Sequence, residues 1–309
     1  MPEKIAVILA KDRNPSPEQQ SLVDQLLAGL EHRPELEVTV VPHLYDLAPE
    51  GPAVRYLRSI RGDMIVLAWL YPRSAYWVLE ANGIEGRLGR TSSLAEGESL
   101  ATTPRKSGRR ESPDRTLWCF DLRAHGDAEP YLRHVAQIVA RRVGLAEQAE
   151  ELAGKPNGNA KALDEATRPR WYPVVDFDRC TGCKECLNFC LFGVYSLDEA
   201  GAIFVEQPDA CRPGCPACAR ICPSGAIMFP QHKDPAIAGD PQASLQGLKL
   251  DLSQIFAVGD PASLAAQERD RALAGEPASG PDRPPTPPDA TSEKATLDSL
   301  VEKLDDLDL

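Results

Sequence analysis

The 309-residue sequence lacks the features that would place it in a membrane or on nucleic acid. No apolar run approaches the roughly 18–20 residues that a membrane-spanning helix requires. Met1 to Ile5 lead directly into an apolar, strand-like segment without the layout of a signal peptide, so a cytoplasmic location is expected. The net charge of −12 provides no excess of positive charge for phosphate groups, which argues against general nucleic-acid binding.

Motifs that would mark a self-contained enzyme are also missing. The sequence offers no nucleophile–base pair, no phosphate-binding loop and no flavin motif. Gly83, Gly86 and Gly89 resemble a glycine-rich loop only in number, because no strand leads into them. The histidines follow no ligand spacing and are expected at surface or core positions. They are His32, His43, His125, His134 and His232.

Cysteine is nearly absent from the first half of the chain and concentrated in the second. Cys119 stands alone in an apolar strand-like segment and is predicted to be a buried, inert thiol. The other eight cysteines lie between Cys180 and Cys222, a density that indicates metal ligation before disulfides in a cytosolic protein. Acidic and basic residues balance in residues 1–144, so the whole net charge belongs to residues 145–309.

Residues 1–144 alternate apolar segments with segments of helical periodicity. The expected strands cover 4–10, 37–41, 64–70 and 116–122. One expected helix begins after Ser16, and the others cover 52–60, 73–81 and 129–143. Ser16, Pro17 and Gln19 form a helix start with a capping box. Because the strands are apolar throughout, we expect an α/β domain whose parallel sheet is covered by helices on both faces.

Two polar segments are expected to lack regular structure. Residues 83–115 interrupt the α/β domain and are predicted to be a long mobile insertion. Residues 145–170, which contain the run from Gly154 to Asn159, are predicted to be a linker. The insertion contains a basic group that favours a solvated loop, although it could also receive an acidic partner or the acidic tail of the chain. This group is Arg105, Lys106, Arg109 and Arg110.

The chain ends in two further segments. Residues 236–290 combine a moderately apolar extension with a proline-rich linker. Residues 291–309 are predicted to form an acidic amphipathic helix with one apolar stripe. That helix could dock into the groove of a partner, fold back on its own chain or fray.

The eight clustered cysteines form an internal repeat within an expected domain, residues 171–235. The first quartet is Cys180, Cys183, Cys186 and Cys190, and the second is Cys211, Cys215, Cys218 and Cys222. The last three cysteines of the first quartet, and Gly193 after them, recur 32 residues later in the second. Three cysteines two residues apart let a tight loop wrap three corners of a cubane iron–sulfur cluster, while the fourth ligand comes from elsewhere.

This pattern resembles that of bacterial-type ferredoxin domains with two [4Fe–4S] clusters. By this resemblance, one cluster takes Cys180, Cys183, Cys186 and Cys222, and the other takes Cys190, Cys211, Cys215 and Cys218. It also implies a ferredoxin-like α+β fold with strands over 172–176 and 226–229 and a hairpin over 194–206. The residues expected to shield the clusters are Phe189, Leu191, Phe192, Tyr195, Ile221, Ile227 and Phe229.

The sequence departs from this pattern at two places. Leu191 stands where the first run usually has proline after its fourth cysteine. Three residues rather than two separate Cys211 from Cys215, and Gly214 among them can adopt the positive φ that a widened loop requires. Since no ligand is missing, two four-iron clusters are still expected.

Structural zinc is the principal alternative cofactor. Zinc sites commonly use paired C-x-x-C knuckles, which two runs of four cysteines fit poorly. A second alternative is an interaction scaffold in which iron–sulfur clusters serve only a structural purpose. Electron-carrying clusters are favoured over structural ones because a pair of clusters makes a short electron path.

The predicted function is therefore electron transfer, with the α/β domain positioning a redox protein partner. This favours an electron carrier or electron-transfer subunit over a self-contained enzyme. In the alternative, the α/β domain binds a small molecule that is reduced through the clusters.

In its order of elements the N-terminal half resembles one lobe of the sirohydrochlorin-type cobalt or iron chelatases. Those families place a metal-binding histidine after the first strand, where this chain has Lys11, Asp12 and Arg13, so their activity does not carry over.

Overall fold

The computed structural model describes residues 4–91, 115–143 and 160–243. Met1–Asp251 forms one compact unit, and a second unit, Leu252–Leu309, lies outside the described residues. The predictions for the basic group at 105–110, for most of the linker and for the helix at 291–309 also concern residues outside this part of the chain. Among the described residues, no helix has the length and apolar character needed to cross a membrane.

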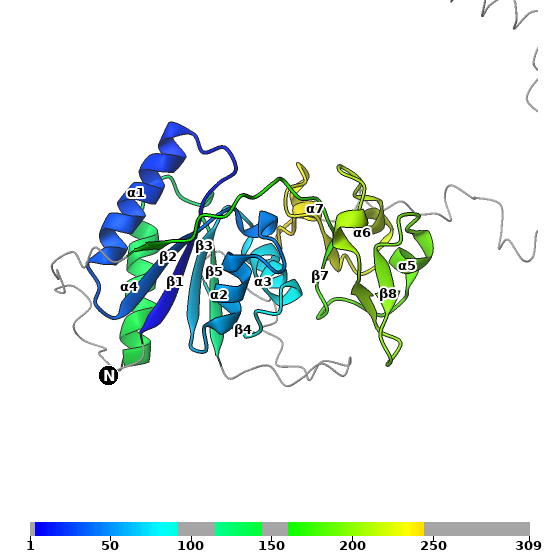
Figure 1. Ribbon diagram of the computed structural model, residues 1–309, viewed down its shortest axis with the longest axis horizontal. Coiled ribbons are helices and arrows are strands. Elements are labelled where there is room, and N and C mark those ends of the chain that lie inside the picture. The colour runs from blue at the N-terminus through cyan, green and yellow to red at the C-terminus, as the bar shows by residue number, and fades with distance from the viewer. Residues whose placement is uncertain (1–3, 92–114, 144–159, 244–309) are drawn as a thin grey trace, which may run out of the picture. The chain divides into compact units, whose positions relative to one another are not determined.

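The N-terminal half is built on a six-stranded sheet in which every pairing is parallel (Figure 1). Its strand order is β4-β5-β3-β1-β2-β6. The strands are β1 (Ile5–Ala10), β2 (Leu36–Val41), β3 (Met64–Ala68), β4 (Arg87–Leu88), β5 (Thr116–Asp121) and β6 (Lys161–Ala162). The predicted α/β fold of this half is confirmed.

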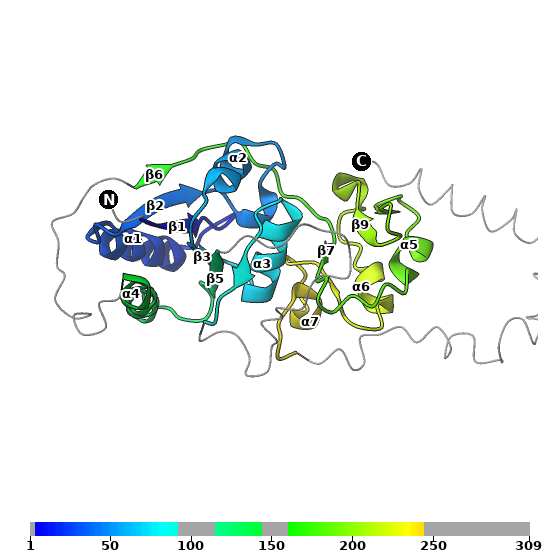
Figure 2. The ribbon, with the colours of Figure 1, turned by 90° about the horizontal axis from the view of Figure 1, so that it is seen from below.

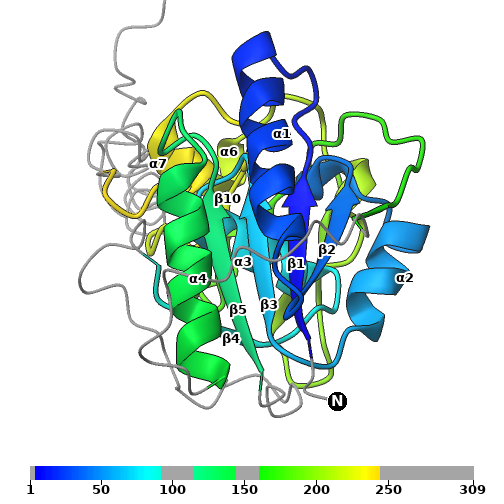
Figure 3. The ribbon, with the colours of Figure 1, turned by 90° about the vertical axis from the view of Figure 1, so that its left-hand side faces the viewer.

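Helices cover both faces of the sheet, as the apolar strands require. Helices α1 (Pro17–Glu31) and α4 (Glu129–Val143) lie on one face, and α2 (Pro52–Ser59) and α3 (Pro72–Ala81) lie on the other (Figures 2 and 3). Side chains of β1 alternate between the two cores: Ile8 packs with the residues of α2 and α3, and Leu9 packs with those of α1 and α4.

The start of α1 forms as its sequence predicts. The Ser16 hydroxyl accepts a hydrogen bond from the backbone N–H of Gln19, and the Gln19 side chain accepts one from the N–H of Ser16 at 2.7 Å. Pro17 occupies the first turn, where its missing N–H leaves no hydrogen bond unmade. The capping box therefore fixes where the chain leaves β1 and enters the helix.

Two segments expected to lack regular structure contribute edge strands instead. β4 falls at the start of the insertion predicted over 83–115 and pairs with β5. β6 falls in the linker predicted over 145–170 and pairs with β2. Each strand is only two residues long, too short for an alternating pattern to show in the sequence.

The cysteine-rich segment contains two small antiparallel sheets and short helices. One sheet pairs β7 (Val174–Val175) with β10 (Ile227–Met228), and the other is a hairpin of β8 (Tyr195–Leu197) and β9 (Ile203–Val205). These are the strands expected near 172–176, 194–206 and 226–229. The helices are α5 (Glu185–Phe189), α6 (Ala217–Ile221) and α7 (Pro235–Ala238), with one 3₁₀ turn, η2 (Pro208–Ala210). A further 3₁₀ turn, η1 (Leu44–Asp46), follows β2 in the N-terminal half.

Within the Met1–Asp251 unit, the cysteine-rich segment packs directly on the sheet half. Tyr172, Val174 and Met228 are buried in the same apolar core as α2 and α3. The Tyr45 hydroxyl accepts a hydrogen bond from the Tyr172 backbone N–H at 2.7 Å and donates one to the Tyr172 carbonyl. Their rings stack with centroids 4.3 Å apart, so the two halves share one continuous interior.

Candidate functional site

The internal repeat of the cysteine-rich segment is present in the backbone. Helix α6 repeats α5 with the same 32-residue offset that separates the cysteines. Gly182 and Gly214, each preceding a cysteine, have φ of 71° and 78°, and Gly193 and Gly225 have 65° and 63°. Such angles cost little only at glycine, so the two loops share one demanding conformation.

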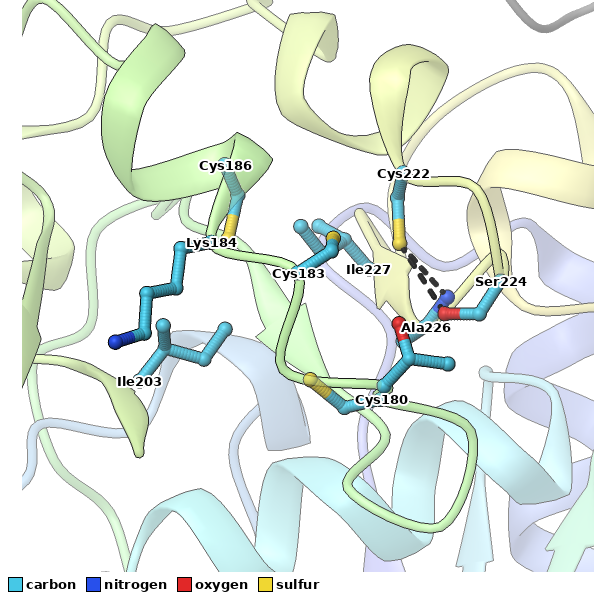
Figure 4. A pocket seen from close by; sticks show the side chains of 10 residues that line it. Cys180, Cys183, Lys184, Cys186, Ile203, Cys222, Ser224, Ala226 and Ile227 are labelled. Carbon is cyan, nitrogen blue, oxygen red and sulfur yellow. Dashed lines mark hydrogen bonds between the residues drawn. The ribbon is translucent and has the colours of Figure 1, made fainter. Parts of the chain in front are cut away.

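Four thiols from both ends of this segment line one hollow that opens to solvent (Figure 4). They are Cys180, Cys183, Cys186 and Cys222. The first three come from the loop that leads into α5, and the fourth follows α6. Cys186 and Cys222 are buried, whereas Cys183 is exposed, so this hollow meets the surface at Cys183.

The other four cysteines form a second neighbourhood. Cys211 lies close enough to Cys215 and Cys190 for their charges to influence it. Cys218 is influenced by Cys211 and Cys190, and also by Cys186 of the first hollow. Burial raises the pKa of the Cys211 and Cys218 thiols to about 12, as it does for Cys186 in the first hollow. Buried thiolates at these positions therefore require a positive ion or cluster to stabilise them.

The two short helices connect the two groups of thiols. Cys186 lies within α5 and Cys190 ends it, with the Cys190 N–H donating to the Cys186 carbonyl at 3.1 Å. Cys218 likewise lies within α6, and Cys222 is its C-cap residue. Because four residues of helix rise about 6 Å, each helix places one thiol in each group within a short distance.

Backbone groups around the first hollow are fixed by the chain itself. The Ala226 N–H donates to the Cys222 sulfur at 3.3 Å, and the Ser224 hydroxyl lies 3.6 Å from it (Figure 4). The Cys180 N–H donates to the Asp176 carbonyl at 3.0 Å. Lys184 begins α5 at φ 64°, the one positive φ outside glycine among the described residues. Donors of this kind stabilise negative charge on sulfur.

The donor set fits an iron–sulfur cluster. All four side chains with strong metal affinity at the hollow are thiols, the ligands that hold cubane clusters. The described residues contain no group of three or more His, Cys, Asp or Glu gathered as they would be around one metal ion. The thiols instead line the walls of a hollow. The class of site is therefore that of an iron–sulfur protein.

The expected shielding of the clusters is only partly correct. Tyr195, Ile227 and Phe229 are buried in the core that contains the cysteines. Leu191 is 92% exposed and Phe189 and Phe192 are about two-fifths exposed, so these three are not part of that core and their shielding role stays a prediction. Phe189 is the last residue of α5, and Leu191 and Phe192 follow its C-cap, Cys190.

The lone cysteine behaves as predicted. Cys119 is fully buried in β5, and burial raises the pKa of its thiol to about 12. It packs with the core under α2 and α3 and belongs to neither group of clustered thiols. It is an inert core residue.

The structure also shows residues around the site that sequence patterns did not indicate. Arg73, on α3 of the sheet half, donates to the Asp176 carboxylate at 2.6 Å, and both side chains are about 95% buried. Arg170 donates to Asp209 at 2.9 Å and to the Leu47 carbonyl at 2.9 Å. These pairs join residues more than thirty positions apart, and a lone arginine in a helix gives no sequence signal of such a partner.

Comparison with known proteins identifies relatives that match stretches of 66 to 72 residues, about the length of this segment, although no protein-family profile matches the chain. An uncharacterized ferredoxin of Methanocaldococcus jannaschii is 42% identical over 66 residues, which make up 21% of this chain and 44% of that protein. The pyruvate synthase subunit PorD of the same organism is 33% identical over 70 residues, covering 23% of this chain and 79% of the subunit. Ferredoxin-3 of Nostoc sp. is 33% identical over 72 residues, 18% of this chain and 73% of that protein.

The chain belongs to the ferredoxin family through this segment and is an iron–sulfur protein of electron transport. Its cofactors are [4Fe–4S] clusters. The chain spans less than half the length of the first of these relatives. The matches cover about a quarter of the chain or less, so the resemblance of the N-terminal half to a chelatase lobe stays a prediction.

Proposed function

We propose that the protein is a two-cluster electron carrier, or the electron-transfer subunit of a larger oxidoreductase. Cys180, Cys183, Cys186 and Cys222 would hold one cluster, and Cys190, Cys211, Cys215 and Cys218 the other, in a ferredoxin-like α+β segment. The observation that carries the proposal is the hollow shared by three thiols of the first quartet and the last thiol of the second. This crossed set is the one that the two-cluster pattern requires.

When bound, each cluster supplies a one-electron couple. The chain's own contribution is to fix the ligands and the path between them. Helix α5 and its C-cap would contribute one ligand to each set, and α6 and its C-cap would do the same. The two sites are therefore separated by about one turn of helix. Exposed Cys183 places the first site at the surface, where a redox partner can approach.

The sheet half is proposed to position that partner rather than to bind a small molecule. α/β proteins bind ligands at the carboxyl ends of parallel strands. Here Arg13, after β1, donates to Asp46 at 2.6 Å and to the Arg170 carbonyl at 3.1 Å. His43, after β2, lies 3.0 Å from the Gln231 side chain. These strand-end groups are engaged with the cysteine-rich segment, which favours the carrier over the enzyme.

The partner is proposed to be an oxidoreductase in the cytoplasm. One relative is named as a subunit of pyruvate synthase, which is an assembly of this kind. Clustered thiols kept for metal also suit a reducing compartment. A role of residues 291–309 in docking stays a proposal, since these residues lie outside the part of the chain that the structure describes.

Anaerobic reconstitution of the full chain tests the proposal. We expect about eight iron and eight sulfide per chain, with a visible chromophore that a one-electron reductant bleaches reversibly. Bound zinc in place of iron would overturn it. Clusters that resist reversible reduction, or whose reduction unfolds the chain, would instead favour the structural scaffold.

A second measurement separates the carrier from the enzyme. The carrier exchanges electrons with a protein partner but binds no small molecule at the strand ends. An Asp12→Asn variant should therefore transfer electrons at the wild-type rate, since Asp12 contacts only Gln19 and its own loop in the contacts described. A large loss of turnover in that variant, with clusters intact, would favour the enzyme.

A further inference from the structure

One side chain of the sheet half reaches into the support of the first cluster site. Arg73 lies in the first turn of α3, and its side chain is 4% exposed. Its Nε donates to Asp176 Oδ2 at 2.6 Å, and its Nη2 donates to the Gly225 carbonyl at 2.9 Å. A single guanidinium thus binds two segments that are almost fifty residues apart in the chain.

Asp176 organises the loop that supplies the first ligand. Its second carboxylate oxygen accepts hydrogen bonds from the N–H groups of Asp178 and Arg179 at 3.0 and 3.1 Å. Its carbonyl accepts from the Cys180 N–H at 3.0 Å. The orientation of the Asp176 carboxylate therefore sets the turn that brings Cys180 to the hollow.

Gly225 organises the loop that supplies the last ligand. Its N–H donates to the Cys222 carbonyl at 3.2 Å, and its φ of 63° closes this tight turn. The next N–H, that of Ala226, donates to the Cys222 sulfur itself. The Ala226 carbonyl in turn accepts from the Asp176 N–H at 2.8 Å, which ties the two loops to each other.

We propose that Arg73 is a positioning residue for the first cluster: the sheet half uses it to hold the Cys180 and Cys222 loops in register. This inference rests on the proposed assignment of these two cysteines to one cluster. The arginine guanidinium suits this positioning role, because its N–H donors point in fixed directions and can bind a carboxylate and a carbonyl at the same time. Two cations meet the buried Asp176 carboxylate: Arg73 at 2.6 Å, which is itself buried, and the more exposed Arg179 at 3.7 Å. Arg73 is the closer partner, and loss of the partner of a buried charge is strongly destabilising.

The hydrogen bonds of Arg73 to Asp176 and to the Gly225 carbonyl act on the supports of Cys180 and Cys222, both in the first set. The second set takes its supports from elsewhere: the Trp171 indole donates to the Cys215 carbonyl at 3.1 Å, and Arg170 pairs with Asp209, two residues before Cys211. Loss of Arg73 should therefore weaken one cluster and spare the other.

The test uses the reconstituted full chain with two variants and a control. Arg73→Lys keeps the charge and loses the fork, and Arg73→Met loses both. Arg58→Lys is the matched control, because Arg58 also binds one carbonyl, of Asn82, and one carboxylate, of Glu50, but within the sheet half. The readouts are the rate at which an iron chelator removes each cluster and the reduced-state electron paramagnetic resonance signal of each. A Cys183→Ser variant identifies which signal belongs to the first cluster.

We expect Arg73→Lys to lose the first cluster to the chelator about tenfold faster, in line with the effect of outer contacts on metal affinity, while the second cluster keeps its wild-type rate. Arg73→Met should lose it faster still, and if that variant fails to fold, Arg73→Lys carries the test. Wild-type loss rates and signals in Arg73→Lys, or an equal effect on both clusters, would overturn the inference. Failure of the wild-type chain to bind two clusters would instead overturn the proposed function.

Discussion

The two halves of the molecule solve the problem of a stable interior in different ways. The sheet half surrounds β1 and β3 with two apolar cores, in which residues such as Leu26 and Ile65 are fully buried. The cysteine-rich segment has a small core in which thiols take the place of aliphatic side chains. A segment of this size can hardly fill an interior with side chains alone, so its cofactor is part of its fold.

This difference teaches which perturbation each half resists. Apolar cores lose stability when methyl groups are removed and are indifferent to iron. A thiol-lined core depends on what the thiols bind, because burial disfavours their free thiolate forms. The following predictions sharpen this contrast, from the largest expected effect to the smallest.

Replacing a clustered cysteine should have the largest effect. Cys222→Ala removes a thiol of the first hollow and should lower the iron content by about one to four atoms per chain, because the iron corner that loses its thiolate is released alone or with the whole cluster. Cys119→Ala is the matched control and should keep the full iron content. Iron and sulfide analysis after anaerobic reconstitution makes the comparison. Full iron in Cys222→Ala would remove Cys222 from the ligand set.

Truncation of an apolar core residue should lower the stability of the fold and leave the iron content unchanged. Leu26→Ala in α1 should lower the free energy of unfolding by about 2–5 kcal/mol, because a fully buried leucine leaves a cavity. Its iron content should not change. Leu191→Ala, at a residue 92% exposed, should stay within about 0.5 kcal/mol of wild type. Denaturant titration measures both, and equal losses in the two variants would contradict the assignment of the core.

The contact between the halves should depend on pH through His43. Burial lowers the pKa of His43 to about 4 from its usual 6.5. The charges of Asp46 and Asp12 raise this pKa, and those of Arg13 and Arg123 lower it, but burial has the largest effect. Between these values the unfolded chain binds a proton that the folded chain excludes, so stability falls as pH falls.

The wild type should therefore lose about 2 kcal/mol more between pH 7.5 and pH 5.0 than a His43→Gln variant does. Urea titrations of the metal-loaded chain at the two pH values measure this difference. His125→Gln, at an exposed histidine, serves as the control and should keep the wild-type slope. An equal change in the free energy of unfolding between the two pH values in wild type and His43→Gln would show that His43 is not buried in the neutral form.

Relief of the strained residue at the first hollow should have the smallest effect. Lys184 adopts φ 64°, which costs a residue with a Cβ roughly 1–2 kcal/mol. Lys184→Gly should therefore raise the free energy of unfolding by about 1 kcal/mol. Gly182→Ala, at φ 71° in the same loop, should lower it by a similar amount. Thermal unfolding under anaerobic conditions measures the pair, and a loss in both variants would contradict the strain at Lys184.

The sequence predicted the parts of the fold that have a strong local pattern. The capping box at Ser16, the apolar strands and the cysteine repeat each specify their structure within a few residues, and all three are present in the described residues. The two-residue strands β4 and β6 were missed because edge pairing is decided by the neighbouring strand rather than by local sequence.

The sequence predicted which thiols gather at the first hollow but not the residues that support them. Cysteine spacing identifies thiols because the loop itself must wrap the cluster. The partners of Arg73 lie more than a hundred residues away, in a different half of the molecule, and no local pattern indicates them. The exposure of Leu191 was missed for a related reason, since an apolar residue beside a ligand can face either the cluster or solvent.

The central claim is that two [4Fe–4S] clusters in the cysteine-rich segment carry electrons. A reductive titration of the reconstituted chain, followed by electron paramagnetic resonance, tests it most directly. The account predicts about two spins per chain at full reduction, one from each cluster, with the signals of both altered by their mutual proximity. A single spin per chain that is lost in Cys222→Ala would contradict the claim. A chain that binds zinc and gives no signal would contradict it as well.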